Sequence, residues 1–227
     1  MLRTADSWIK QYQQKDALWF HDGNPKRPHP LLTSGMHSNG FFNSRLIISD
    51  EVLLHLAASD LTEMCPIWEI DLDEIKGVVG PQTGATKLAE FVSYQVMAYT
   101  GKPCFWMSPA KNEVDGVKSM IFNHEELDLL PGQTVLLCED VITTGDSVDL
   151  AADAVLRAGG FVLPAIVALV NRSGLEMVSG KTIIALINHP MPIWTPEDCK
   201  EHHLCSLGSE AIRPKGPPEW ARLNATY

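Results

Sequence analysis

Short apolar runs alternate with amphipathic segments along the middle of the chain, and this pattern predicts an α/β fold. The apolar runs have the length and composition of strands buried in a parallel sheet. Two intervening segments, Thr86–Thr100 and Val148–Ala158, have apolar positions at helical spacing. We therefore expect a doubly wound, mainly parallel sheet with its ligand site at the carboxyl ends of the strands. The expected strands are Gly77–Gly80, Cys104–Met107, Val135–Cys138, Val162–Val170 and Lys181–Ile187.

The flanking regions have different patterns. Thr4 to Phe20 predicts an opening helix, residues 21–30 a Pro-rich loop, and Ser49-Asp50 the cap of a second helix that runs to about Cys65. The Pro-rich tail from Arg213 to Trp220 is expected to pack across the surface. We expect a single domain with an N-terminal region (1–66), an α/β core (67–190) and a C-terminal extension (191–227).

Composition adds limits to this picture. The chain has 227 residues, of which 45% are hydrophobic, and a formal net charge of −10, which argues against a nucleic-acid-binding surface. We find no run long enough for a membrane span and no signal-peptide core, and five cysteines without framework spacing suit buried thiols in a reducing compartment. A cytoplasmic enzyme is the expectation.

Residues 135–147 contain the strongest chemical signal. The expected strand Val135–Cys138 ends in two acids, Glu139 and Asp140, which can accept hydrogen bonds from sugar hydroxyls or orient waters on Mg²⁺. The turn that follows offers hydroxyls, backbone N–H groups and a helix N-terminus, which suit a phosphate monoester. Its residues are Thr143, Thr144, Gly145, Asp146 and Ser147. The alternative is an ordinary turn whose Thr and Ser side chains only cap the helix.

The whole run resembles the phosphoribosyl pyrophosphate (PRPP) signature of the type I phosphoribosyltransferases. The family pattern has four apolar residues, two acids, two apolar residues, Thr-Thr-Gly, any residue and Ser or Thr, and every position conforms. The resemblance implies the type I fold with a small N-terminal hood, PRPP as donor, and Mg²⁺ held through PRPP and waters near Glu139 and Asp140, with no direct protein ligands.

A second loop, Gly80 to Ala85, joins an expected strand to a helix and resembles the pyrophosphate-binding loop of the same family. Its small residues allow close approach of a ligand to the backbone. A plain strand-to-helix turn is the alternative. The candidate PRPP contacts here are Gly80, Gln82, Thr83 and Gly84.

Residues 30–43 are similar to the N-terminal signature of the orotate phosphoribosyltransferases. In that family the segment forms part of a hood over the base, and an aromatic residue stacks on the base; Phe41 and Phe42 can supply this ring. The alternative places both rings in a core. Thr33 stands where the family usually has a lysine.

The segment between Met107 and His124 is polar and lacks periodicity, which is typical of a mobile catalytic loop. In the orotate enzymes this loop reaches the partner's active site, so the resemblance implies a homodimer. Lys111 keeps one loop lysine, whereas Ser108 and Glu113 replace basic or proton-transferring residues, and Gly84 replaces a lysine of the pyrophosphate loop. Lys111 and Asp140 are the candidate catalytic residues.

Two more features lie nearer the C-terminus. Arg172 resembles a family arginine on the base side of the site and can pair with a carboxylate on the base; an exposed loop arginine is the alternative. Four soft ligands, Cys199, His202, His203 and Cys205, make zinc conceivable, but no second pair with finger-like spacing accompanies them.

The resemblance implies displacement at the anomeric carbon of PRPP, with an oxocarbenium-like transition state and no covalent nucleophile. The leading hypothesis is a transferase, specifically a glycosyltransferase of nucleotide metabolism, that acts on orotate or a related pyrimidine in pyrimidine biosynthesis. The first alternative is a PRPP-binding regulator of the same fold with weak or no catalysis, because Thr33, Gly84, Ser108 and Glu113 depart from the family pattern. A purine or another small acceptor is the second alternative.

Overall fold

The structure is a computed structural model that describes residues 2–214 and 216–227. These residues group into two compact units. Unit 1 contains the chain up to Lys10 together with Ser44–His189, and unit 2 contains Gln11–Asn43 together with Pro190–Tyr227. The chain passes between the units after Lys10, Asn43 and His189. Helix α1 (Ala5–Gln14) contributes residues to both units.

Unit 1 is built on a mainly parallel sheet, as the apolar pattern predicts. Within the described residues the sheet has six strands, and only the short edge strand β11 runs antiparallel to its neighbour. Their order across the sheet is β11 (Met177–Val178), β12 (Lys181–Asn188), β10 (Phe161–Asn171), β9 (Thr134–Ile142), β5 (Gly77–Val79) and β6 (Phe105–Met107).

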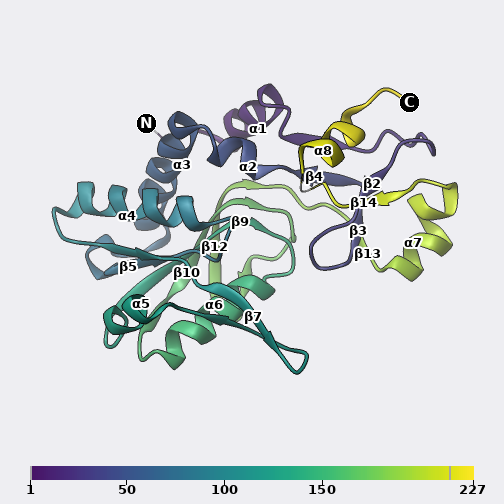
Figure 1. Cartoon of the computed structure of the whole chain (residues 1–227). Helices are drawn as coiled ribbons and strands as arrows, with labels where there is room; N and C mark the ends of the chain where they lie inside the picture. The colour runs from purple at the N-terminus through teal and green to yellow at the C-terminus, as the bar shows by residue number, and fades with distance from the viewer. Residues whose placement is uncertain (1, 215) are drawn as a thin grey trace. The chain divides into compact units, whose positions relative to one another are not determined.

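Helices cover both faces of this sheet. Helices α3 and α4 lie over one face, and α5 and α6 lie over the other (Figure 1). The apolar side of α6, with Val148, Ala151 and Val155, packs against Val135 and Leu137 of β9. The helices of unit 1 are α2 (Ser44–Ile48), α3 (Glu51–Met64), α4 (Thr86–Thr100), α5 (His124–Leu129) and α6 (Asp146–Arg157), with 3₁₀ turns η1 (Cys65–Trp68) and η2 (Leu72–Glu74).

Several helix boundaries agree with their sequence signals. The Asp50 side chain accepts the N–H groups of Val52 and Leu53 and caps α3 as expected, and α4 has the predicted bounds. The first helix does not. It ends at Gln14 and not at Phe20, because Leu18–Phe20 forms β1, which pairs with β4 (Gly40–Phe42).

Unit 2 joins two distant stretches of the chain through short strands. Strand β2 (His29–Pro30) pairs with β14 (Ala211–Ile212), and β3 (His37–Ser38) pairs with β13 (Ile193–Trp194). A small apolar cluster contains Trp19, Ile212 and Leu223. The remaining elements are α7 (Pro196–His202), η3 (Leu204–Leu207) and α8 (Pro217–Asn224), so the proline-rich tail includes a helix that the sequence analysis missed.

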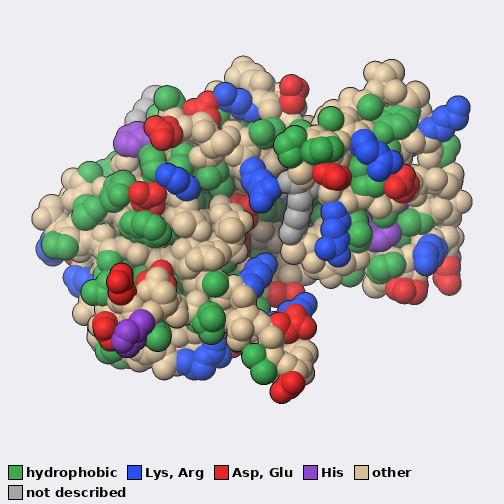
Figure 2. All heavy atoms as spheres, in the orientation of Figure 1, with side chains coloured by type: hydrophobic (Ala, Val, Ile, Leu, Met, Phe, Trp, Pro, Cys, Tyr) green, Lys and Arg blue, Asp and Glu red, His purple; other side chains and the backbone are tan. Residues whose placement is uncertain are grey.

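Acidic and basic side chains are interspersed over the face shown in Figure 2. Among the described residues, no helix is both long and apolar enough to span a bilayer.

Candidate functional site

The strand order of the sheet determines where a ligand can bind. Numbered by appearance in the chain, the parallel strands β5, β6, β9, β10 and β12 lie in the order 2-1-3-4-5, which places the topological switch point between β5 and β9. In open α/β sheets, ligands bind at the carboxyl ends of the strands beside this point. The Gly80–Ala85 loop follows β5 and the 143–147 turn follows β9, so both candidate loops flank the switch point.

Gly84 brings the Gly80–Ala85 loop against Asp140, which belongs to β9 and precedes the 143–147 turn. A Cβ atom on Gly84 would lie 2.6 Å from the Asp140 Oδ2 atom, so only a glycine allows this approach. The lysine that Gly84 replaces in the family pattern could not occupy this backbone position without moving the carboxylate. The Gly80–Ala85 loop therefore lies directly against the acidic pair at the switch point.

The turn after β9 leaves the N-terminus of α6 without a side-chain cap. Gly145 is the N-cap residue at φ 93°, and no side-chain hydrogen bond caps the helix. The alternative of Thr and Ser side chains that only cap a helix is therefore absent here. Uncapped N–H groups and the helix dipole together favour an anion.

Strand β9 continues past the acidic pair, whereas the sequence analysis ended it at Cys138. Glu139 is paired with Ala168 of β10, and the pairing continues to Ile142. Parallel ladder bonds with β10 hold the acids in extended backbone, so their side chains take different directions and different environments.

Glu139 is buried, whereas Asp140 is partly exposed. Burial first, and then the neighbouring Asp140 carboxylate, raise the pKa of Glu139 well above its usual value. Glu139 Oε1 accepts the N–H of Asp140 at 3.0 Å, and Asp140 Oδ1 accepts the N–H of Val141 at 2.8 Å. Asp140 is thus the more accessible of the two carboxylates, and the two acids have unequal environments.

Ser108 forms hydrogen bonds that fix the Gly80–Ala85 loop. The Ser108 hydroxyl donates to the Gly80 carbonyl at 2.8 Å, and the Gln82 side chain donates to the Ser108 carbonyl at 2.9 Å. Ser108 also donates its N–H to Glu126 at 2.9 Å. Ser108 is buried at the end of β6, so it supports the loop and is not a residue of the catalytic lid.

A hollow of about 290 Å³ borders this loop at Thr83 and Gly84. Two cationic residues, Arg45 of α2 and Lys87 in the first turn of α4, also line it. Neither residue belongs to a motif, so neither was predicted; the position of Lys87 two residues after the loop was the available signal. Cations beside an anion-binding loop suit a polyphosphate.

The expected mobile loop is a β-hairpin. Strands β7 (Ala110–Val114) and β8 (Val117–Ile121) pair antiparallel around Asp115-Gly116, and both turn residues have positive φ. Asp-Gly is a strong hairpin signal that the sequence analysis did not use. Lys111 is exposed on β7, and its charge lowers the pKa of Glu139 against the larger effect of burial. Lys111 is thus near enough to the acidic pair for its charge to affect the pKa of Glu139.

Arg172 lies directly after β10 and is buried, which contradicts the alternative of an exposed loop arginine. Its N–H donates to the Ile142 carbonyl at 3.0 Å, so it adjoins the turn after β9. Burial lowers the pKa of Arg172 to about 10, and the side chain remains cationic at neutral pH.

The base-contact candidates of the hood belong to unit 2. Phe42 is buried and packs edge-on against Tyr12 with ring centroids 5.3 Å apart. Phe41 is half-buried beside Trp220, and Thr33 is exposed. Phe42 is therefore a core residue of unit 2, as the alternative anticipated, and Phe41 is the ring with an exposed part.

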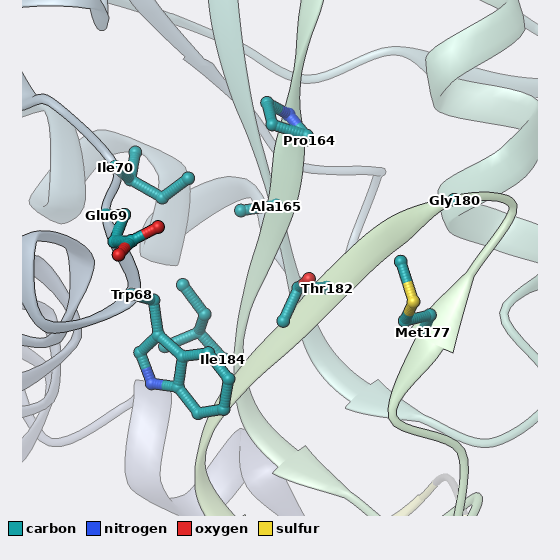
Figure 3. Close-up of a pocket in the computed structure, with 9 residues that line it drawn as sticks. All are labelled: Trp68, Glu69, Ile70, Pro164, Ala165, Met177, Gly180, Thr182 and Ile184. Atoms are coloured by element: carbon teal, nitrogen blue, oxygen red, sulfur yellow. The ribbon is translucent and has the colours of Figure 1, made fainter.

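A second cavity of about 280 Å³ lies elsewhere (Figure 3). It is lined by Trp68, Glu69 and Ile70 and by the first halves of β10 and β12, including Ala165 and Ile184. These halves are the amino ends of the strands, so this cavity is at the edge of the sheet opposite the candidate site.

The comparisons with known proteins agree with this geometry. The sequence profile of the phosphoribosyl transferase domain matches residues 67–195. An orotate phosphoribosyltransferase of Pelotomaculum thermopropionicum is 33% identical over 82% of this chain and 87% of its own, and one of Nitratiruptor sp. is 27% identical over 88% and 96%. The orotate phosphoribosyltransferase structure from Aeropyrum pernix has a TM-score of 0.57 at 21% identity, covering 79% of this chain and 92% of its own, which indicates a shared fold. The chain belongs to the phosphoribosyl transferase domain family.

Proposed function

We propose that this protein transfers ribose 5-phosphate from PRPP to orotate or a related pyrimidine. The observation that carries this proposal is the contact of Gly84 with Asp140 at the switch point, which joins a phosphate turn, a sugar-hydroxyl acceptor and a pyrophosphate loop in one surface. Relatives named orotate phosphoribosyltransferase support orotate as the acceptor.

PRPP fits this surface in one orientation. Its 5-phosphate binds the N–H groups at residues 143–147, and a ribose hydroxyl donates to Asp140. Its pyrophosphate lies over Gly80–Gly84, near Arg45 and Lys87. The buried Glu139 supports Asp140 by accepting its N–H and does not itself need to bind the sugar.

The donor set also fits a magnesium ion. The partly exposed Asp140 carboxylate, adjoining the pyrophosphate loop, can hold waters of a hydrated divalent cation. Bound Mg²⁺ would neutralise charge on the pyrophosphate. No direct protein ligand is required, in keeping with the resemblance.

Catalysis by the protein itself then consists of stabilising the leaving group. Negative charge accumulates on the pyrophosphate as the anomeric bond breaks, and Lys111 is the mobile cation that can meet it. The exposed hairpin that carries Lys111 can close over the site and exclude water. No covalent nucleophile is needed.

The proposed contacts to the base are Arg172 and Phe41. Arg172 supplies a buried cation that can pair with the carboxylate of orotate. Phe41 remains the proposed stacking ring. Phe42 contributes indirectly, as a core residue of unit 2 that packs on Tyr12.

The experiment is orotate consumption, followed by absorbance, with PRPP and Mg²⁺. We expect measurable but slow turnover, because Thr33, Gly84 and Glu113 lack the charged or proton-transferring groups of the family pattern. Each lost charge-assisted contact can lower the rate roughly ten- to a hundredfold. Turnover in the ordinary range of about 1–1000 per second would show that other residues have taken over these roles.

A PRPP-binding regulator is the second candidate, favoured by the exposed Glu113, which stands where the family pattern has a proton-transferring residue. Pyrophosphate release with orotate, uracil and adenine separates the candidates. A regulator binds PRPP, as a shift in melting temperature shows, but releases no pyrophosphate with any base. Release with adenine alone identifies a purine acceptor.

Three further assignments are part of the proposal and rest on the resemblance: a homodimer, a cytoplasmic location and a place in pyrimidine biosynthesis. Light scattering of the purified protein tests the first. A molar mass equal to one chain at micromolar concentration contradicts the dimer.

A further inference from the structure

Four soft side chains converge in unit 2, far in sequence from the PRPP motifs. They are His29 of β2, His37 of β3, Cys199 of α7 and Cys205 of η3, and their ligand atoms all lie within 4.8 Å of one another. Both cysteines are free thiols, so no disulfide explains their proximity.

The distances within this cluster approach those of a tetrahedral metal site. The His29 Nε2 atom is 3.0 Å from His37 Nδ1, 3.6 Å from Cys199 Sγ and 3.5 Å from Cys205 Sγ, and His37 Nδ1 is 3.3 Å from Cys205 Sγ. Zinc bonds of about 2.0–2.1 Å to nitrogen and about 2.3 Å to sulfur give tetrahedron edges of roughly 3.3–3.8 Å. Four of the six separations are thus within a few tenths of an ångström of these edges, and all six are within 4.8 Å.

The surroundings orient the ligands. The Ser209 hydroxyl donates to the Arg27 carbonyl at 2.6 Å, so it accepts at 2.8 Å from Nδ1–H of His29. This tautomer leaves the Nε2 lone pair of His29 directed at the cluster, as in metal sites whose histidines are fixed by a second hydrogen bond. The Cys205 N–H donates to Cys199 Sγ at 3.3 Å, which holds the sulfur in place within the cluster.

The cluster differs from the ligand set suggested by sequence. His202 is exposed, and His203 bonds Asp198 at 3.1 Å and stacks on Trp194, so neither histidine joins the cysteines. The histidines that do join them come from the N-terminal segment, with seven residues between them. Sequence spacing could not reveal a site assembled from segments so far apart.

We propose that His29, His37, Cys199 and Cys205 bind one structural Zn²⁺ ion that fastens the two segments of unit 2 together. Four protein ligands complete a tetrahedron and leave no position for a substrate, which is characteristic of a structural site. His29 and Cys199 are fully buried and His37 nearly so. Unit 2 has two-residue strand pairs and a small apolar cluster, and small cores of this kind often need a metal for stability.

The first test is the metal content of untagged protein, measured by inductively coupled plasma mass spectrometry. We expect about one zinc per chain in the wild type and in the control variants His202→Ala and Cys104→Ala. His37→Ala and Cys205→Ser should contain less than about a tenth of that amount, because each removes a ligand. Retention of zinc by both ligand variants would overturn the proposal.

The second test does not depend on folded variants. Wild-type protein is stripped with a chelator and titrated with Co²⁺, and we expect the visible bands of tetrahedral Co²⁺ with thiolate charge transfer, saturating at one equivalent and displaced by Zn²⁺. Chelation should also lower the melting temperature, and Zn²⁺ should restore it. A wild type that contains no zinc and gives no tetrahedral Co²⁺ spectrum would show that the four side chains form only a hydrogen-bonded cluster.

Discussion

Asp140 and Glu139 are neighbours in the chain but have different environments. Both were expected from sequence to bind the ribose, because two adjacent acids matched the family pattern. The ladder with β10 buries Glu139 and leaves Asp140 beside Gly84. A sequence shows that two acids are adjacent, but it does not show which of them the sheet buries.

This difference predicts unequal effects on PRPP binding. Asp140→Asn should weaken binding about ten- to a hundredfold, since a charge-assisted hydrogen bond contributes about 1.5–3 kcal/mol. Glu139→Gln should change the affinity less than about threefold, because the amide resembles the protonated acid in its hydrogen bonding. Calorimetric titration with PRPP and Mg²⁺ measures both. Equal losses in the two variants would restore the assignment of both acids to the sugar.

Glu139 also predicts a dependence of stability on pH. Burial raises the pKa of Glu139, so the folded protein keeps a proton that the unfolded chain loses above about pH 4.3. The contribution of Glu139 to the free energy of unfolding therefore falls as the pH rises from about 4.3 toward the raised pKa. Glu139→Gln removes the effect. The urea midpoint of the Glu139→Gln variant should therefore increase relative to that of the wild type between about pH 5 and about pH 8.

The matched control for this experiment is Glu113→Gln, which neutralises an exposed glutamate of the hairpin. It should follow the wild type across the same range. Parallel curves for Glu139→Gln and the wild type would mean that Glu139 is ionised in the folded protein.

Ser108 shows a further limit of inference at single positions. The family pattern made it appear to be a lid residue that had lost a lysine, but three hydrogen bonds direct it toward the Gly80 loop and α5. A lysine at this position would disrupt the loop, so we do not expect Ser108→Lys to raise activity.

At the scale of elements, the strongest periodic segments were predicted well. α4 has its predicted bounds, and the expected strands of the sheet all exist, because buried apolar runs and uninterrupted helical periodicity depend on local sequence. The predicted bounds are wrong where pairing with a distant strand determines the secondary structure. Leu18–Phe20 is a strand because β4 lies beside it, and β9 is longer than its apolar run because β10 continues the ladder.

The position of Lys111 on the hairpin predicts that removing its side chain will affect turnover more than PRPP affinity. Lys111→Ala should lower turnover about tenfold or more and change PRPP affinity less, since this exposed lysine acts mainly as charge develops on the leaving group. Lys118→Ala, an exposed lysine on the opposite strand of the same hairpin, is the control. Steady-state kinetics and calorimetry together give the two quantities. A rise in the PRPP Michaelis constant at unchanged turnover would assign Lys111 to ground-state binding.

At the scale of the whole molecule, the PRPP signature and the pyrophosphate loop lie in unit 1, whereas the hood segment 30–43 lies in unit 2. The first two motifs follow or end the strands β5 and β9, and their positions could be predicted because the family pattern is local. Unit 2 depends on contacts between residues 11–43 and 190–227, which no local pattern encodes. Cys199 and Cys205 of the four-residue cluster were therefore predicted from sequence but His29 and His37 were not, and helix α8 was not predicted.

Leu223 tests the role of α8 in the stability of unit 2. It is fully buried against Trp19, whose indole N–H donates to the Leu223 carbonyl at 2.9 Å. Leu223→Ala should lower the free energy of unfolding by about 2–5 kcal/mol. Leu156→Ala, at a position 56% exposed, should change it by less than about 0.5 kcal/mol. Urea unfolding followed by tryptophan fluorescence measures both, and similar midpoints would show that α8 is only loosely attached.

The discontinuity of unit 2 has a consequence for biosynthesis. The strands β2 and β3 leave the ribosome long before β13 and β14, their partners from the C-terminal segment, have been translated. At about 5–20 residues per second, the N-terminal segment waits roughly 10–40 s. Throughout that interval its histidines and apolar side chains are exposed to chaperones and to metal ions of the cell, while the strands of the unit 1 sheet are still being translated. Premature termination after residue 189 would therefore release a chain with a formed PRPP surface and an unpaired N-terminal segment, a natural substrate for quality-control proteases.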